Sequence, residues 1–387
     1  MAGLHFGSRG GGGLSANISL GGGTALTLSS VISHFRSDQP LPALDDFSRA
    51  SAGWALDGSN VVQEYASDVI RVGPAGAWVE GARTNYIYNN VLAGAAAPNT
   101  PPTGWSAPAA SDLTVEASIF YSGDALGQVA ADSRPYIRTP SIVWPAGDYA
   151  ISYFVEALSF NTWNTAFEVG FLVGPAAVAE LAPYRVSGVV TQESEVTGRV
   201  RFGLGVAGNE TGTATLSLLQ VEAGAFPSTP ILVAATDAPF TRSAEQWLTG
   251  LAEDMTTLTV FVEATAAPGL SGNQVLFQAD DGSEDDRLTI RRNSSGNLIV
   301  ETFVDGVAEA SIDLGAVANS ASIRVTAYVE AGSLRARLGD GGTVVEDTGG
   351  AMPTLTAGRT GHNSATASHW FGTVSERIVA RVAPVSF

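Results

Sequence analysis

Short runs of β-branched and aromatic residues, separated by turn residues, set the fold class of this chain. Runs rich in Val, Ile, Thr, Phe and Tyr recur between clusters of Gly, Pro, Asn and Asp, and the apolar spacing of an amphipathic helix is hard to find. The pattern predicts an all-β chain, with one short helix at residues 244–251. The expected strands include residues 113–120, 149–158, 166–173, 199–206, 214–221, 257–264, 275–278, 287–291, 298–303, 322–329 and 333–338.

Two turn sequences predict that neighbouring strands pair antiparallel. Ser295-Gly296-Asn297 and Asp305-Gly306 both lie between strand-like runs. Hairpin turns need positive φ angles, which Gly, Asn and Asp adopt most readily. Polar and apolar residues partly alternate in 298–303, so we expect one buried and one solvated face.

The length of the chain predicts more than one module. A chain of 387 residues exceeds the roughly 250–300 residues at which single cores stop growing. We expect a glycine-rich N-terminal arm followed by two antiparallel β-sandwich (jelly-roll) modules in tandem. We also expect that deletion of residues 1–45 leaves both sandwiches folded. The boundaries suggested by composition are 1–80 for the arm, 81–235 for the first module and 236–387 for the second.

Charge and composition exclude several classes of partner and chemistry. The chain has 38 acidic and 20 basic residues, for a net charge of -18, and contains no Cys. Nucleic-acid binding needs a basic stripe, and Arg residues cluster nowhere beyond the pair Arg291, Arg292. Disulfides, thiolate metal sites and a Cys nucleophile are excluded. The sequence shows no export signal and no apolar run of roughly 18 residues, so we expect synthesis in the cytoplasm and no membrane insertion.

Several short strings stand in the same order as in a known protein family. Together they resemble the tail-fibre and head-spike proteins of bacteriophages and gene transfer agents, in which such strings flank a jelly roll similar to carbohydrate-binding modules. One of them, Phe47-Ser48-Arg49-Ala50, is echoed later in the chain by Phe240-Thr241-Arg242-Ser243. The strings are Phe47-Ser48-Arg49-Ala50, Glu80-Gly81-Ala82-Arg83-Thr84-Asn85, Gly104-Trp105 and Gln220-Val221-Glu222-Ala223-Gly224.

The C-terminal module is similar to a second group of β-sandwiches. It resembles concanavalin A-like and laminin G-like domains. The resemblance lies in Leu276-Phe277, in Arg287-Leu288-Thr289-Ile290 and in the closing Trp370-Phe371-Gly372-Thr373-Val374.

These resemblances imply a structural protein of the virion surface without enzymatic activity. It would attach to other virion proteins of a tail, a baseplate or a capsid vertex, and would leave the bacterial cytoplasm with the particle. It would bind host cell-surface polysaccharide during adsorption. Linking weak sites raises avidity by about 10²–10⁴, so a homo-oligomer is expected, and a trimer in the case of a tail fibre. A polysaccharide depolymerase and a free bacterial lectin remain alternatives.

Aromatic residues beside amides are the candidate sugar-binding groups. A sugar ring stacks its apolar face on an aromatic ring, while its hydroxyls bond to planar amides or carboxylates. In the first module, the loop patch Asn161, Trp163 and Asn164 is the best candidate. The alternative is a Trp that packs in the core, and this alternative is favoured more strongly for Trp105 and Trp144. A second candidate rim, in the C-terminal module, consists of His362, Asn363, His369 and Trp370.

The loop from Asp280 to Asp286 is a candidate calcium site. It holds five carboxylates in seven residues, and Ca²⁺ prefers oxygen ligands. The expected ligands are Asp280, Asp281, Asp285 and Asp286. The alternative is a solvated hairpin tip, which is the more common structure for such a run of charges.

Overall fold

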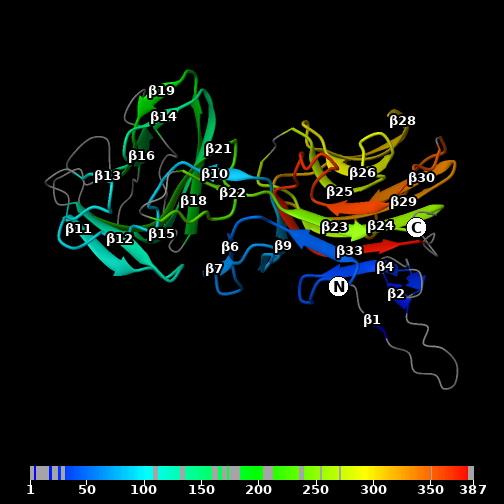
Figure 1. Cartoon of the computed structure of the whole chain (residues 1–387), viewed down its shortest axis with the longest axis horizontal. Helices are drawn as coiled ribbons and strands as arrows, with labels where there is room; N and C mark the ends of the chain where they lie inside the picture. Colours follow the sequence, from blue (N-terminus) through cyan, green and yellow to red (C-terminus); the bar gives the residue numbers. More distant parts are fainter. Residues whose placement is uncertain are drawn as a thin grey trace. The chain divides into compact units, whose positions relative to one another are not determined.

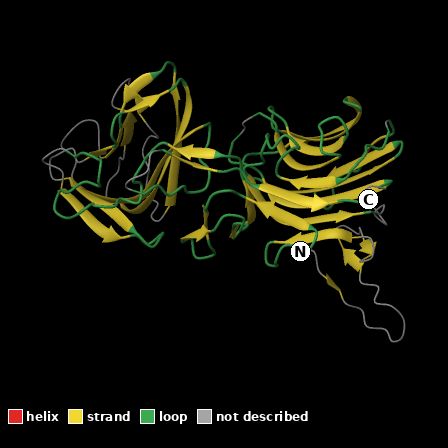
Figure 2. Cartoon of the chain, in the orientation of Figure 1, coloured by secondary structure: helices red, strands yellow, loops and turns green. Residues whose placement is uncertain are grey.

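All regular secondary structure in the described part of the computed structural model is β-strand (Figure 2). The all-β prediction is confirmed. The helix expected at 244–251 is wrong, because alternate side chains of Gln246–Gly250 are buried and this segment forms strand β23. The structure describes residues 4–5, 17–19, 25–27, 31–107, 112–130, 136–158, 164–167, 172–173, 184–203, 212–234, 239–252, 255–269, 272–349 and 351–381.

The chain folds into two units, and each unit is built from stretches that are separated in the sequence. Unit 1 comprises Met1–Ala50, Ser67–Gly81 and Ala244–Phe387, and unit 2 comprises Ser51–Ala66 and Ala82–Ser243. These limits differ from the expected arm and consecutive modules, because residues 31–80 supply strands to both units. Before residue 31, the structure describes three short strands that form one sheet: β1 (Leu4–His5), β2 (Asn17–Ser19) and β3 (Ala25–Thr27).

Unit 1 is a sandwich of two antiparallel sheets, here named sheet A and sheet B (Figure 1). Their facing apolar side chains form one core, which includes Trp247, Phe277 and Trp370. Sheet A contains, in order, β28 (Val307–Ala316), β27 (Asn297–Val304), β26 (Arg287–Arg292), β25 (Gln274–Asp280), β32 (Ala357–Thr360), β23 and β5 (Asp45–Ser48). Sheet B contains β31 (Val345–Asp347), β30 (Ser333–Leu338), β29 (Ser322–Glu330), β24 (Thr257–Thr265), β33 (Gly372–Ala380), β9 (Gly76–Val79) and β8 (Val72–Gly73), with β4 (Val31–Arg36) also paired to β33.

Strands β4 and β5 both contact the C-terminal strand of unit 1, β33. The blue strand β4 lies beside the red strand β33 in Figure 1, and the two pair antiparallel. Arg377 of β33 is fully buried, forms an ion pair with Asp45 of β5 and donates a hydrogen bond to Ser33 Oγ of β4 at 2.8 Å. Trp247 Nε1 and Thr249 Oγ1 also donate to Asp45, at 3.0 and 2.8 Å. Residues 31–48 are therefore part of the sandwich.

Unit 2 is also built of antiparallel sheets around one main apolar core. Trp105 and Trp144 lie in this core as expected, and Trp144 Nε1 donates to Gly198 O at 3.1 Å. The largest sheet has the order β11 (Asp112–Ala117), β12 (Asp124–Ala130), β21 (Gly212–Ala223), β10 (Arg83–Asn85) and β22 (Phe240–Arg242), with β15 (Gly147–Leu158) beside β21 and β18 (Tyr184–Gln192) beside β15. Smaller sheets contain β13 (Tyr136–Arg138), β20 (Val200–Gly203), β16 (Asn164–Phe167) and β17 (Leu172–Val173), then β14 (Ile142–Trp144) with β19 (Val196–Gly198), and β6 (Gly53–Leu56) with β7 (Val62–Tyr65).

Each of the two turn sequences connects two antiparallel strands of sheet A. β26 pairs with β27, and β27 pairs with β28. Gly296 has a φ of 90°, and Asp305 and Gly306 have φ values of 51° and 76°. Positive φ at both central positions is typical of a tight two-residue hairpin turn, so the predicted turn chemistry is confirmed.

Within the described residues, no helix that could span a bilayer is found.

Candidate binding site on sheet A

A polar hollow of about 210 Å³ lies on the outer face of sheet A, next to the loop at residues 361–371. The strands β25, β26 and β27 contribute Gln278, Arg287, Thr289, Arg291, Glu301 and Phe303. Loop residues Glu284, Asn363 and Ser368 also line it.

Strand alternation explains which side chains reach the hollow. Leu288 and Ile290 of β26 enter the core, so Arg287, Thr289 and Arg291 face outward. In β25 the register shifts between Val275 and Phe277, and both Leu276 and Phe277 join the core. This β-bulge lets Val275 and Gln278 face the same hollow although they are three residues apart.

Arg287 and Phe303 form a cross-strand pair in the hollow. They are direct register partners, and the guanidinium carbon lies 3.6 Å from the centre of the phenyl ring. Such stacking is a favourable cation–π contact. Arg287 Nε lies 3.7 Å from Glu284 Oε2. Within the residues that the structure describes, the Arg287 side chain donates no hydrogen bond.

Arg291, in contrast, is fully engaged by neighbouring side chains. Its Nε and Nη2 donate to the two carboxylate oxygens of Glu301 at 2.6 and 3.1 Å. Its Nη1 donates to Asn273 Oδ1 at 3.0 Å. This bidentate pairing restrains both side chains, which line the hollow.

Glu284 fastens the loop 361–371 to the hairpin between β25 and β26. Its Oε1 accepts hydrogen bonds from Ser364 N at 2.9 Å, from Ser364 Oγ, and from Gln278 Nε2 at 3.1 Å. Burial opposes ionisation of Glu284, but these hydrogen bonds and the charge of Arg287 outweigh it, so the pKa of Glu284 lies below its usual value. The carboxylate is therefore ionised at neutral pH and holds the loop in place.

The predicted rim at 362–370 is only partly at the surface. His362 is fully buried, and its Nε2 accepts a hydrogen bond from Trp247 N at 3.1 Å, so its Nδ1 carries the proton and donates to Asn363 O at 2.9 Å. Desolvation lowers the pKa of His362, which is neutral at pH 7. His369 is 6% exposed, and its ring centre lies 5.9 Å from that of His362.

Trp370 belongs to the core of unit 1 and has no ring face open to a sugar. It is fully buried, and its Nε1 donates to Thr265 O at 2.9 Å. The expected rim is thus corrected: His362, His369 and Trp370 support the loop from inside. Of the four residues, Asn363 lines the hollow.

The acidic loop forms the tip of the hairpin between β25 and β26. Asp280 is buried and accepts hydrogen bonds from Arg359 Nε and Nη2 at 2.7 and 3.1 Å. Asp281 accepts from Ser283 N at 2.9 Å, and Asp286 accepts from Thr354 N at 3.4 Å. Across the described residues, no group of three or more Asp, Glu or His side chains is arranged to hold a metal ion. Calcium binding by Asp280, Asp281, Asp285 and Asp286 stays a prediction, and this arrangement favours the solvated hairpin tip.

The side chains of the predicted patch in unit 2, at residues 161, 163 and 164, lie outside what the structure describes. Asn161 and Trp163 lie outside the described residues, and Asn164 begins strand β16 with its side chain undescribed. Sugar binding by these three residues stays a prediction.

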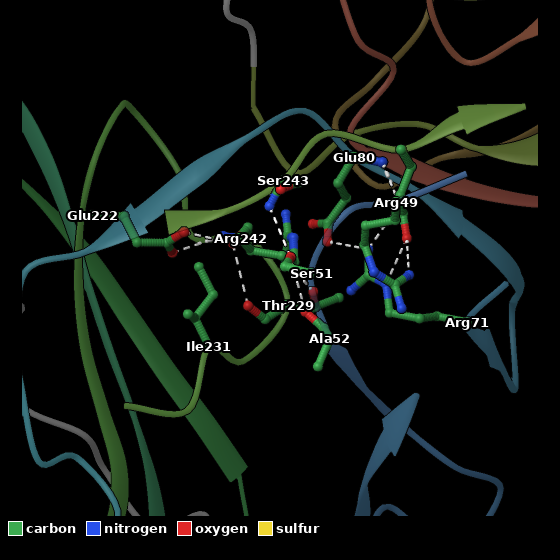
Figure 3. A network of polar contacts seen from close by, with 12 residues as sticks. Arg49, Ser51, Ala52, Arg71, Glu80, Glu222, Thr229, Ile231, Arg242 and Ser243 are labelled. Atoms are coloured by element: carbon green, nitrogen blue, oxygen red, sulfur yellow. Dashed lines mark hydrogen bonds and ion pairs between the residues drawn. The ribbon is translucent and has the colours of Figure 1, made fainter. Parts of the chain in front are cut away.

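A second group of charged side chains is buried within unit 1 (Figure 3). Glu245 Oε1 accepts from Arg49 Nη1 at 2.8 Å and from Arg71 Nε at 2.7 Å, and Arg71 Nη2 also donates to Glu80 Oε2 at 2.8 Å. All four side chains are at most 2% exposed. Burial alone would lower the pKa of Arg71, but Glu245 and Glu80 outweigh it and raise this pKa. The pairing keeps the network charged in the interior.

Gly81 connects this network to the loop beside the hollow. It follows Glu80, and a Cβ atom at this position would lie 2.7 Å from Phe371 Cζ and 3.0 Å from His369 Nδ1. Contacts under 3 Å require a shift of the neighbours. A side chain at this position would therefore require Phe371 or His369 to move.

The sequence reasoning missed the strand residues of the hollow. The available signal was the two-residue spacing of Arg287, Thr289 and Arg291, and of Glu301 and Phe303. It marks the outer face of a strand pair, but neither the β-bulge in β25 nor the neighbouring loop is visible in that spacing.

Comparisons with known proteins assign no family to this chain. No family model matches the sequence, and no curated protein matches it. Among solved structures, domains LG4-5 of the mouse laminin α1 chain align over 82% of this chain and 93% of theirs, with 9% identity and a TM-score of 0.26. The tail fibre protein gp63.1 from E. coli phage G7C aligns over 73% of this chain and 40% of its own length, with 12% identity and a TM-score of 0.24. At these low TM-scores the fold assignment rests on this chain's own strand pairing, which makes it an all-β protein of antiparallel sandwiches.

Proposed function

We propose that this chain is a non-enzymatic fibre or spike protein of a phage-like virion that binds host cell-surface polysaccharide. The hollow on sheet A of unit 1 would be the binding site. The observation that carries this proposal is the presence there of an aromatic ring, a planar guanidinium and an amide beside one another on a sheet.

The chemistry of the hollow suits a sugar ring. The guanidinium of Arg287, stacked on the ring of Phe303, provides a flat surface, and Asn363 and Ser368 provide hydrogen-bonding groups at the edge. Sheet residues are held by neighbouring strands on both sides, so little side-chain order has to be gained on binding. Unit 1 would thus present a preformed site.

The resemblance of the short strings to fibre and spike proteins supports the virion part of the proposal. Several residues of these strings also make buried contacts. In unit 1, Arg49 and Glu80 belong to the buried ion-pair network. In unit 2, Asn85 is buried, its Oδ1 accepts from Val221 N at 3.1 Å, and Glu222 accepts from Ser228 N at 2.9 Å. In this chain, the strings that resemble fibre and spike proteins therefore contain residues with structural roles. Attachment to tail, baseplate or capsid proteins and assembly as a trimer belong to the same proposal.

The test measures binding and cleavage together. Purified protein is incubated with polysaccharide from bacterial hosts, and bound protein and newly formed reducing ends are followed. We expect saturable binding without release of reducing ends. Phe303→Ala should abolish binding with an intact fold, whereas Arg335→Ala, which removes a partly exposed side chain of sheet B, should bind normally.

Three results would contradict the proposal. Steady release of reducing ends would make the chain a depolymerase. Unchanged binding by folded Phe303→Ala would move the site away from sheet A. Absence of the protein from purified particles, with the protein free in the medium, would favour a bacterial lectin.

A further inference from the structure

We infer that the hollow on sheet A recognises a carboxylated sugar and that Arg287 is the residue that contacts the carboxylate. This inference rests on the proposed function, because it names the class of glycan that the same site would take.

Arg287 differs from four other partly exposed arginines of unit 1 in having no close carboxylate within the described residues. Its nearest carboxylate oxygen, on Glu284, lies 3.7 Å from Nε, and no hydrogen bond from its side chain is found among the described residues. A guanidinium prefers a bidentate partner with two parallel hydrogen bonds. Carboxylates approach to 2.6 Å from Arg291, 2.8 Å from Arg324, 2.9 Å from Arg335 and 2.7 Å from Arg359.

Phe303 prepares Arg287 for a planar partner. The guanidinium carbon lies 3.6 Å from the ring centre, and the side chain of Arg287 is only 16% exposed. The contact restrains the cation, so that less conformational entropy is lost when its free N–H groups meet a carboxylate. A carboxylate in the plane of the guanidinium would receive two parallel hydrogen bonds.

Most carboxylate oxygens of the hollow are already engaged by protein donors, while Arg287 and Asn363 keep donors for a ligand. The carboxylate of Glu301 is occupied by Arg291, and Oε1 of Glu284 is occupied by Ser364 and Gln278. Asn363 uses its Oδ1 to accept from Ala367 N at 2.8 Å, while its Nδ2 donates no hydrogen bond within the described chain. A sugar that carries a carboxylate supplies the acceptors that these donors lack.

The net charge of the protein gives the interaction a distinctive dependence on salt. A body of charge -18 repels a polyanion at long range, while contact with Arg287 acts over a few ångströms. Raising the salt from about 10 mM to about 150 mM shortens the screening length from about 30 Å to about 8 Å. We therefore expect faster association at the higher salt, the reverse of what a basic polyanion-binding protein shows.

The experiment compares a glycan with its own neutral derivative. Full-length protein is screened on an array of neutral and carboxylated bacterial glycans, and the best ligand is then tested before and after chemical reduction of its carboxylates to alcohols. We expect the native ligand to bind at least about tenfold more tightly than the reduced one, as loss of a charged hydrogen bond implies. Arg287→Gln should bind both forms equally weakly, Arg287→Lys should keep part of the preference, and the matched control Arg335→Gln should keep all of it.

The outcomes separate the inference from the function on which it rests. If the wild-type protein binds no glycan, the proposed function fails. If it binds the native and the reduced ligand equally, or if folded Arg287→Gln keeps the preference, the carboxylate inference is overturned while glycan binding stands. The wild-type comparison needs no variant, so a folding defect in Arg287→Gln cannot obscure the result.

Discussion

Two groups of Arg and Glu side chains in unit 1 share their chemistry and differ in exposure. In the buried network, Arg49 and Arg71 each meet a carboxylate oxygen within 2.8 Å. In the hollow on sheet A, Arg287 has its nearest carboxylate oxygen at 3.7 Å, and the Glu284 side chain is 40% exposed. A buried charge must be paired, because desolvation costs several kcal/mol per ion. At the surface, water solvates an incompletely paired cation, and Arg287 therefore keeps N–H groups for the proposed ligand.

The largest expected effect is the loss of stability of unit 1 when residues 1–45 are deleted. Deletion of residues 1–45 removes strand β4 and Asp45, so Arg377 is left buried without its carboxylate. That loss costs about 3–5 kcal/mol. Loss of the buried Phe35 costs about as much again. The sum approaches the whole stability of an ordinary domain, so we expect unit 1 to unfold, contrary to the expectation from sequence.

A shorter deletion is the matched control for this prediction. Removal of residues 1–30 leaves β4, β5 and every described strand of sheets A and B in place. Its thermal unfolding should match that of the full chain. A folded protein after deletion of 1–45, measured by near-UV circular dichroism and calorimetry, would contradict the assignment of β4 and Asp45 to the sandwich.

Glu245→Ala should be the most damaging single substitution in the charge network. It removes the carboxylate that pairs with both Arg49 and Arg71, and leaving buried charges unpaired costs about 3–5 kcal/mol. The free energy of unfolding in urea would measure this loss. Glu346→Ala, which removes the partner of the partly exposed Arg335, is the control and should leave the unfolding midpoint unchanged. Equal effects of the two substitutions would mean that burial does not separate the two groups.

The fold was largely predictable from sequence because strand signals are local. The expected strand at 287–291 and the turns at Gly296 and Asp305-Gly306 match the structure closely. The helix at 244–251 failed because a short apolar run does not distinguish helix from strand. Assignment of 31–80 to an arm failed because strands such as β4 are completed by a partner more than 300 residues away, at β33.

The site was less predictable because it depends on contacts between distant segments. Trp370 is apolar and aromatic in either role, and only packing shows that it is buried. Asn363 lines the hollow because Glu284 accepts a hydrogen bond from the neighbouring Ser364, 80 positions away in sequence. The position of the Arg287 side chain depends on Phe303 of the neighbouring strand, which the sequence around Arg287 does not reveal.

A smaller effect should follow from the acidity of Glu284. Its pKa is lowered in the folded state, so its ionised form stabilises the folded protein above the unfolded-state pKa of about 4.3. That contribution is lost as the pH falls through the lower folded-state pKa. The charged groups near this carboxylate are Arg287 of β26 and, through Gln278, Asp280 of β25.

Glu284→Gln isolates this contribution. The difference in melting temperature between wild type and Glu284→Gln should be constant from pH 7 to pH 5 and should shrink below about pH 4. Because the side chain is partly exposed, the difference should be small even at neutral pH. A difference that grows on acidification would mean that the pKa of Glu284 is raised, and that Ser364 does not hold the ionised carboxylate.

The smallest expected effect is that of calcium, which we expect to leave the melting curve unchanged. Asp280 already pairs with Arg359 through two hydrogen bonds, and Asp281 is engaged by Ser283. A calcium ion would have to displace Arg359 to recruit Asp280. A true site would instead stabilise the folded state by about 2.7 kcal/mol at a calcium concentration one hundred times its Kd. Melting curves in chelator and in millimolar calcium decide between the two. A melting temperature that rises with calcium, and no longer does so in the double variant Asp285→Asn, Asp286→Asn, would establish the acidic loop as a metal site. It would then no longer be a merely solvated hairpin tip.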